Sequence, residues 1–213
     1  MTNELVDTLS ADLVPVSRWH VPGRLLLGLG AGSGVSIVLV LATLGLRPDM
    51  PHAVETGMFW MKLVYPLSLT LIAGLSAERL ARPAASARAR TAWLAAPLIA
   101  VFGIACIELA LAPAPVRMTL LMGGSARVCP LLVLAFAIPP LAGLVWAIRG
   151  LGPTRFREAG AAIGLAAGGA GAFAYAWHCT ETGAPFLALW YTVGIAAAAL
   201  LGWLLGPRLL RWA

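Results

Sequence analysis

Two of the three cysteines in this chain of 213 residues stand at the ends of neighbouring apolar segments. Cys129 follows Arg127 and opens one segment, and Cys179 follows His178 and closes the next. If both segments cross a bilayer, these two ends lie on the same side of it. Two thiols close a disulfide when their Cα atoms are about 5.5 Å apart, and a neighbouring imidazolium favours the reactive thiolate. We therefore take Cys129 and Cys179 as a candidate redox or sensor pair.

The residues around the two thiols also suit a soft or borderline metal ion such as zinc, cadmium or copper, which accepts thiolate, imidazole and carboxylate donors. His52 and Glu55, in an earlier loop, are supplementary candidates. No fixed-spacing metal motif is present, and a purely structural disulfide accounts for the cysteines equally well. Disulfide sensing, metal binding and a structural bridge therefore remain alternatives. The candidate metal ligands are Cys129, Cys179, His178 and Glu181.

Three other side chains in the apolar segments could carry chemistry, but each also has a structural interpretation. Glu108 is an acid inside an apolar run, and we expect it to reach the interface or to accept a hydrogen bond from a neighbouring helix. Lys62 is expected to extend to the lipid headgroups, and Cys106 to pack as a small buried hydrophobe. A transport path needs several polar groups along the spans, and their scarcity disfavours a small metal transporter.

The composition indicates a polytopic membrane protein. The chain is 60% hydrophobic and 11% charged, with a mean hydropathy of +0.87, which lies outside the soluble globular range. A helix needs about 20 apolar residues to cross the ~30 Å hydrocarbon layer. Continuous runs rich in Ala, Leu and Gly favour helices over strands. We predict an all-α fold, with residues 1–213 as one bundle of six transmembrane helices over residues 25–46, 58–77, 92–111, 128–148, 159–177 and 185–205.

The basic residues predict the orientation of this bundle. The side that holds the N-terminus carries eleven arginines, at positions 18, 24, 79, 82, 88, 90, 149, 155, 157, 208 and 211. The opposite side carries four basic residues, Arg47, Lys62, Arg117 and Arg127. The positive-inside rule then places both termini in the cytoplasm and the two cysteines outside. The N-terminus lacks a cationic region, so we expect no removable signal peptide.

Residues 1–24 are the one sizeable polar segment, and we expect a cytoplasmic tail there. Leu5, Leu9 and Leu13 fall on one face of a short helix that Pro15 ends, and Asp12 lies at the border of this face. Acidic residues on the polar face argue against binding to anionic lipid. Either the segment docks a cytoplasmic protein, or it packs against the base of the bundle.

Glycines recur at small-xxx-small spacing in the first and fifth predicted helices, which lets helix backbones approach closely. We expect this packing to be intramolecular rather than a dimer contact. The glycines concerned are Gly28, Gly30, Gly32 and Gly34, and Gly160, Gly164, Gly168 and Gly169.

Over nearly its whole length, the chain resembles the NrsF family of integral-membrane anti-sigma factors. The most specific similarities lie in residues 120–129 leading into Ile138-Pro139, and in residues 168–181 around His178-Cys179. Further similarity is carried by residues 7–18, 59–62, 189–195 and 206–212.

This resemblance implies a bacterial inner-membrane protein that holds an extracytoplasmic-function sigma factor inactive. The positions of the basic residues, which act as topology signals, argue against direct binding of nucleic acid. The resemblance also implies release of that factor by stress from outside, heavy metals or oxidants, through a cysteine pair that matches Cys129 and Cys179. No cofactor is implied beyond reversible heavy-metal binding, and no catalysis. The residues we expect to contact the sigma factor are Leu5, Leu9, Asp12 and Leu13.

The main alternative from another class is a membrane thiol–disulfide oxidoreductase. Such enzymes usually carry a Cys-x-x-Cys pair and a second pair that relays electrons. The sequence contains neither, so we favour a regulatory protein over an enzyme.

Overall fold

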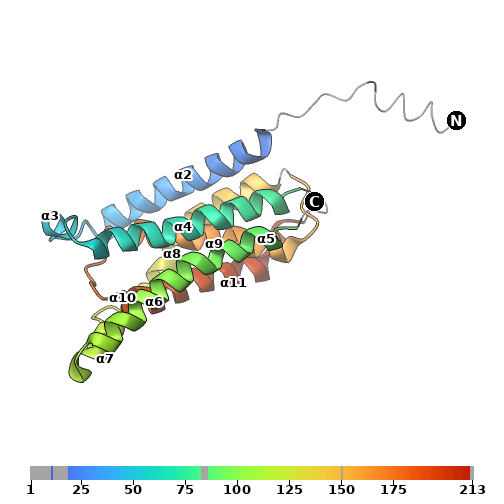
Figure 1. The fold of residues 1–213 in the computed structure, drawn as a ribbon. Coiled ribbons are helices and arrows are strands. Elements are labelled where there is room, and N and C mark those ends of the chain that lie inside the picture. The colour runs from blue at the N-terminus through green and yellow to red at the C-terminus, as the bar shows by residue number, and fades with distance from the viewer. Residues whose placement is uncertain (1–10, 12–18, 83–85, 150, 212–213) are drawn as a thin grey trace.

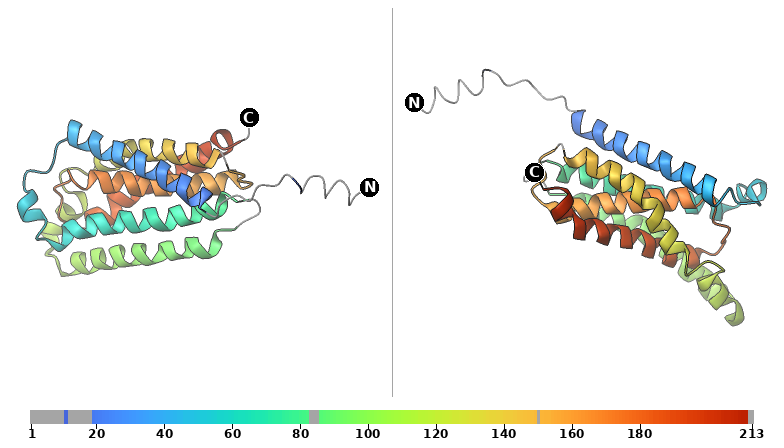
Figure 2. Two further views of the ribbon diagram at one scale, coloured as in Figure 1. Left: turned by 90° about the horizontal axis from the view of Figure 1, so that it is seen from above. Right: turned by 180° about the vertical axis from the view of Figure 1, so that it is seen from behind.

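The computed structural model describes residues 11, 19–82, 86–149 and 151–211, and within these ranges every regular element is helical. Six long helices alternate in direction along one bundle (Figures 1 and 2). They are α2 (His20–Thr43), α4 (Gly57–Leu80), α6 (Ala95–Leu111), α8 (Cys129–Arg149), α9 (Phe156–Tyr175) and α11 (Thr192–Leu209). The short elements are α3 (Met50–Ala53), α5 (Arg88–Thr91), η1 (Ala92–Leu94), α7 (Ala114–Met122), α10 (Ala184–Phe186) and η2 (Leu187–Tyr191).

Five helices in the described part of the chain are long and apolar enough to cross a membrane, which is consistent with a membrane protein. They cover His20–Thr43, Gly57–Leu80, Ala92–Leu111, Cys129–Arg149 and Ala184–Leu209. The all-helical prediction is confirmed. The remaining predicted span, residues 159–177, falls on α9, a helix rich in glycine and alanine that is not among these five. It runs through the middle of the bundle (Figure 2), and most of its residues are buried.

Glycine allows the central helices to pack at backbone distance. A Cβ atom on Gly28 of α2 would collide with the backbone of Gly143 in α8, and one on Gly160 of α9 would collide with Gly202 of α11. These faces therefore pack within the chain, as predicted. The outward-facing glycines of α2 have no neighbour within 4 Å of such an atom: Gly30 and Gly34.

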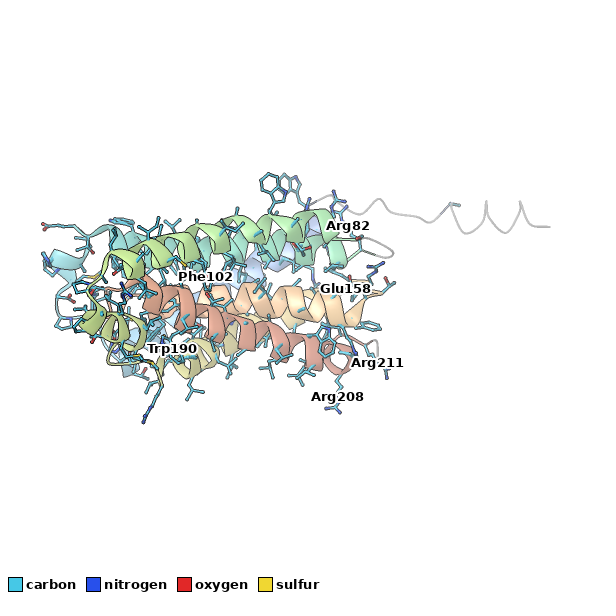
Figure 3. All side chains as sticks on the ribbon, turned by 60° about the horizontal axis from the view of Figure 1, so that its bottom comes forward. Arg82, Phe102, Glu158, Trp190, Arg208 and Arg211 are labelled. Carbon is cyan, nitrogen blue, oxygen red and sulfur yellow. The ribbon has the colours of Figure 1, made fainter. Side chains whose placement is uncertain are left out.

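The two ends of the bundle differ in composition. The α4–α5 and α8–α9 connections, the start of α2 and the end of α11 share one end, where Figure 3 labels Arg82, Glu158, Arg208 and Arg211. Here Glu78 pairs with Arg82 at 3.1 Å and with Arg90 at 3.5 Å. The opposite end holds α3, α7 and α10 (Figure 1). We call these the arginine-rich end and the cysteine end.

The helices differ from the prediction in two respects. Helix α2 begins at His20 rather than at residue 25, because Arg24 is held within the helix by a hydrogen bond to the carbonyl of Ala147 at 3.2 Å and by the ring of Trp146 at 4.9 Å. Helices α3 and α7 were not predicted. The amphipathic segment with Leu5, Leu9, Asp12 and Leu13 lies outside the described residues.

Candidate functional site

The two candidate sensor cysteines lie in one hydrophobic cluster at the cysteine end of the bundle. Cys129 is the first residue of α8 and is 0% exposed, whereas Cys179 follows the end of α9 and is 3% exposed. Both carry free thiols, and their side chains are close enough to interact electrostatically. The fold therefore brings together two residues 50 positions apart in the sequence (179 − 129). Their burial shields them from bulky reagents.

The backbone carbonyl of Cys179 is held by two cations from different elements. Lys62 Nζ of α4 donates to this oxygen at 3.0 Å, and Arg47 Nη1 of the α2–α3 connection donates to it at 3.2 Å. Lys62 Nζ also lies 3.6 Å from Cys179 Sγ. Hydrogen bonds from charged donors are stronger than neutral ones. Both the backbone and the thiol of Cys179 are thus fixed by charged groups.

The expectation that Lys62 extends to the headgroups is wrong, because its side chain is 0% exposed and points into the bundle. The aliphatic stem of lysine is long enough to reach the end of a neighbouring helix, where the Cys179 carbonyl is free of helical bonding. Burying a cation without a partner costs several kcal/mol, so these contacts are needed to hold it. The one feature of the sequence that distinguishes this residue is that Lys62 is the only lysine of the chain.

Arg47 forms an ion pair with the carboxylate of Asp49. Its Nε and Nη2 atoms donate to Asp49 Oδ1 and Oδ2, each at 2.7 Å, although the guanidinium side chain is only 4% exposed. Hydrogen bonding by Arg47 lowers the pKa of the Asp49 carboxyl from 3.8 to about 2, and the same bonds raise the pKa of Arg47. This pair stays ionised throughout the physiological range.

The α2–α3 connection is further tied to the segment before Cys179. The backbone N–H of Arg47 donates to the carbonyl of Trp177 at 3.1 Å, and His178 Nδ1 donates to the carbonyl of Gly45 at 3.1 Å. Gly45 has φ +77°, a left-handed conformation that favours glycine. His178 is therefore engaged in shaping this connection.

Glu181 joins the two cysteine-bearing segments. Its Oε1 accepts hydrogen bonds from the backbone N–H groups of Gly124 and Ser125, at 2.8 and 3.1 Å, and from the Ser125 hydroxyl at 2.9 Å. The close approach also needs Gly123, because a Cβ there would collide with the carboxylate and because its φ is +52°. The carbonyl of Ser125 in turn accepts the N–H of Cys129 at 2.9 Å.

The predicted metal ligands are not gathered around one point. Among the described residues, no three His, Cys, Asp or Glu side chains form a group that could hold a metal ion. The carboxylate of Glu181 and the imidazole of His178 bind loop atoms instead. His52 and Glu55 are exposed and lie 3.8 Å from each other. The structure brings the two thiols together and leaves these donors outside the pair.

Two predictions about α6 have different outcomes. Glu108 Oε2 accepts a hydrogen bond at 2.9 Å from the N–H of Ala184, the first residue of α10. A hydrogen bond from a neighbouring helix was one of the two alternatives expected for Glu108. The prediction that Cys106 is buried is wrong, because its side chain is exposed on the outer surface of α6. The reason is that α6 packs at the edge of the bundle, where only 11% of its apolar stretch is buried.

Aromatic rings enclose the thiols. Tyr175 and Tyr191 lie 6.0 Å apart between ring centroids, and Phe59 meets Trp177 edge-on at 5.9 Å. The Tyr191 hydroxyl is buried and lies beside Cys179. The site therefore combines polar groups with surroundings that exclude water.

An all-helical bundle with five helices long and apolar enough to cross a membrane is consistent with the class of polytopic membrane proteins. Within this class, the chain belongs to the NrsF family, because the family model described as "Negative regulator of sigma F" matches residues 9–212.

Curated relatives match over full length. The chain is 40% identical to the anti-sigma-F factor NrsF of Caulobacter vibrioides (strain NA1000 / CB15N), and the match covers 99% of each chain. It is 35% identical to a probable anti-sigma-F factor NrsF of Azospira oryzae, again over 99% of each chain. A comparison with solved structures found no match.

Proposed function

We propose that this protein is an anti-sigma factor of the bacterial inner membrane, a regulator without catalytic activity. The observation that carries the proposal is the full-length match to a protein named anti-sigma-F factor, at 40% identity. By this relation, the partner is a sigma factor, which we take to be of the extracytoplasmic-function class. The protein would hold it at the cytoplasmic face and keep it from transcription.

We further propose that Cys129 and Cys179 sense stress on the outer side of the membrane. An oxidant that accepts two electrons would convert the two S–H bonds to one S–S bond, and two protons would leave. A soft heavy-metal ion would instead bind the two thiolates reversibly. Support comes from the burial of both thiols in one cluster and from their position opposite the arginine-rich end.

The output surface of this proposal is the arginine-rich end, together with residues 1–24. Two observations support this part of the proposal: α2 begins and α11 ends at this end of the bundle, and the excess of arginine there favours a cytoplasmic side by the positive-inside rule. A signal at the thiols can shift the equilibrium only by its differential affinity for two states of the bundle, typically about 1–3 kcal/mol.

The test uses a reporter under the control of the regulated promoter. Because one thiol can neither close a disulfide nor chelate a soft ion well, Cys129→Ser, Cys179→Ser and the double variant should share one phenotype. The stress response is lost while repression persists, or repression itself is lost if the reduced pair holds the bundle together. Cys106→Ser is the matched control and should respond as the parent does, since its thiol faces away from the bundle. Additive effects of the two single substitutions would refute a single site.

A further inference from the structure

We propose that Lys62 is the residue that couples the state of Cys179 to helix α4, and through α4 to the arginine-rich end. This inference rests on the sensor function proposed above and assigns its route across the membrane. The observation that carries it is the double contact of Lys62 Nζ with Cys179, at 3.0 Å to the carbonyl oxygen and 3.6 Å to the sulfur.

The charge of Lys62 makes this contact sensitive to the sulfur. Arg47, the other cation on the Cys179 carbonyl, has Asp49 as its counter-charge at 2.7 Å. Among the described residues, no carboxylate lies within ion-pair distance of Lys62, whose acceptors are the oxygen and sulfur of Cys179. The buried ammonium therefore depends on this one residue. Arg47 does not.

Reaction at the sulfur changes what Lys62 can bind. In a metal complex, one electron pair of the sulfur binds the metal. In a disulfide, the sulfur keeps both of its lone pairs, but the S–S bond that replaces the S–H bond turns it toward the partner sulfur and away from its position beside the ammonium. In both cases the contact between Lys62 Nζ and the sulfur is weakened, whereas the unreacted state keeps it. This difference in contacts between the two states is what a ligand or a reaction needs in order to shift a conformational equilibrium.

Helix α4 connects this contact to the cytoplasmic side. Lys62 lies near its start and Glu78 in its last turn, 16 residues later (78 − 62), a distance of about 24 Å along a helix. Glu78 binds Arg82 at 3.1 Å and Arg90 at 3.5 Å, and Arg90 also donates to the carbonyl of Leu75 at 2.6 Å. A shift of α4 at Lys62 would therefore move the connection to α5.

The experiment compares Lys62→Met, which keeps the length and removes the charge, with Lys62→Arg, which keeps a charged donor. In membranes of each variant, thiol oxidation is followed by alkylation, and release of the sigma factor by co-purification. We expect the thiols of Lys62→Met to oxidise at a rate within about twofold of the parent. The amount of sigma factor that this variant releases should be at least about fivefold lower than in the parent. Lys62→Arg should restore much of the release.

Arg117→Met is the matched control, because it removes an exposed cation of α7, at the same end of the bundle, that binds the carbonyl of Ala112 and not Cys179. Its release should follow the parent, and an equal loss in Arg117→Met and Lys62→Met would overturn the proposal. Release that persists in Lys62→Met would also overturn it, while leaving the sensor function intact. Release that does not depend on Cys129 or Cys179 would instead refute the sensor function itself.

A second measurement keeps the proposal falsifiable if Lys62→Met does not accumulate. Arg79 is exposed in the last turn of α4, so an Arg79→Cys variant in a Cys106→Ser background reports on the far end of the helix. Its maleimide labelling rate should change severalfold when the Cys129–Cys179 pair is oxidised. A rate that oxidation leaves unchanged would overturn the route through α4.

Discussion

The Glu181 carboxylate accepts hydrogen bonds from both the backbone N–H and the hydroxyl of Ser125, at 3.1 and 2.9 Å. Ser125 lies four residues before Cys129, and Glu181 lies two residues after Cys179. The two cysteine-bearing segments are therefore joined by a contact that does not involve sulfur. This contact holds the two cysteine-bearing segments beside each other before any reaction of the thiols takes place.

Removing that contact should weaken the site. In Glu181→Ala, three hydrogen bonds to a carboxylate are lost, and we expect the free energy of unfolding to fall by about 1–3 kcal/mol. Disulfide formation between Cys129 and Cys179 should also slow. Thermal unfolding in detergent and a time course of oxidation measure the two effects. Glu55→Ala is the control, since Glu55 is 75% exposed; equal behaviour of the two variants would contradict the prediction.

The orientation in the membrane can be tested with exposed positions. Because the native cysteines at 129 and 179 are buried, they are poor targets for a bulky impermeant maleimide. In a Cys106→Ser background, Arg127→Cys and Thr180→Cys should be labelled on intact cells, whereas Arg82→Cys should be labelled only after lysis. Labelling of Arg82→Cys on intact cells would reverse the topology and exclude outside sensing by this pair.

Glycine substitutions should separate packed positions from open ones. In Gly164→Ala, the new Cβ would collide with the backbone of Ala198 in α11, whereas at Gly103 of α6 it would meet nothing within 4 Å. We expect Gly164→Ala to lose about 1–3 kcal/mol of stability, as overpacked cores do. Gly103→Ala should be neutral or gain up to about 1 kcal/mol from helix propensity. The melting temperatures of the two variants in detergent measure this difference. Equal melting temperatures would argue against tight packing between α9 and α11.

The N-terminal segment should contribute to holding the sigma factor, because a short helix with a leucine-bearing face is marginal alone in water and needs a surface to dock on. Deletion of residues 1–13 should release the factor constitutively and leave the protein in the membrane. Reporter activity and membrane fractionation measure both properties. Unchanged repression would assign the interface to the loops around residues 79–90 and 149–157 instead.

The Arg47–Asp49 pair should contribute to stability in a pH-dependent way. The pKa of Asp49 is about 2 in the folded protein and 3.8 without the partner, so its contribution is complete above about pH 4 and is lost as the pH falls toward 2. The stability difference between the parent and Asp49→Asn should therefore be constant from pH 7 to about 4 and shrink below that. A difference that begins to fall at pH 6 would implicate another group.

The sequence alone determined the class of fold and the positions of the long helices. Continuous apolar runs of about 20 residues become helices because a bilayer admits only helices and closed β-barrels, and barrel strands need alternating polar and apolar residues. The glycine spacing correctly predicted close packing within the chain, although it did not show that Gly28 meets Gly143 or that Gly160 meets Gly202. Helix α9, which is not among the five helices of membrane-spanning length and apolarity, was still recognisable from its length between polar segments.

The tertiary structure decided which polar groups meet. Lys62 and Cys179 are 117 residues apart, and hydrophobic periodicity carries no information about which side chain reaches across to another helix end. The same applies to Glu181, whose position beside Cys179 indicated a metal ligand, whereas the fold presents to it the N–H groups of residues 124 and 125. Cys106 was misplaced for a related reason: an apolar helix in a membrane protein can face neighbouring helices or the outside with the same composition, and only packing distinguishes the two.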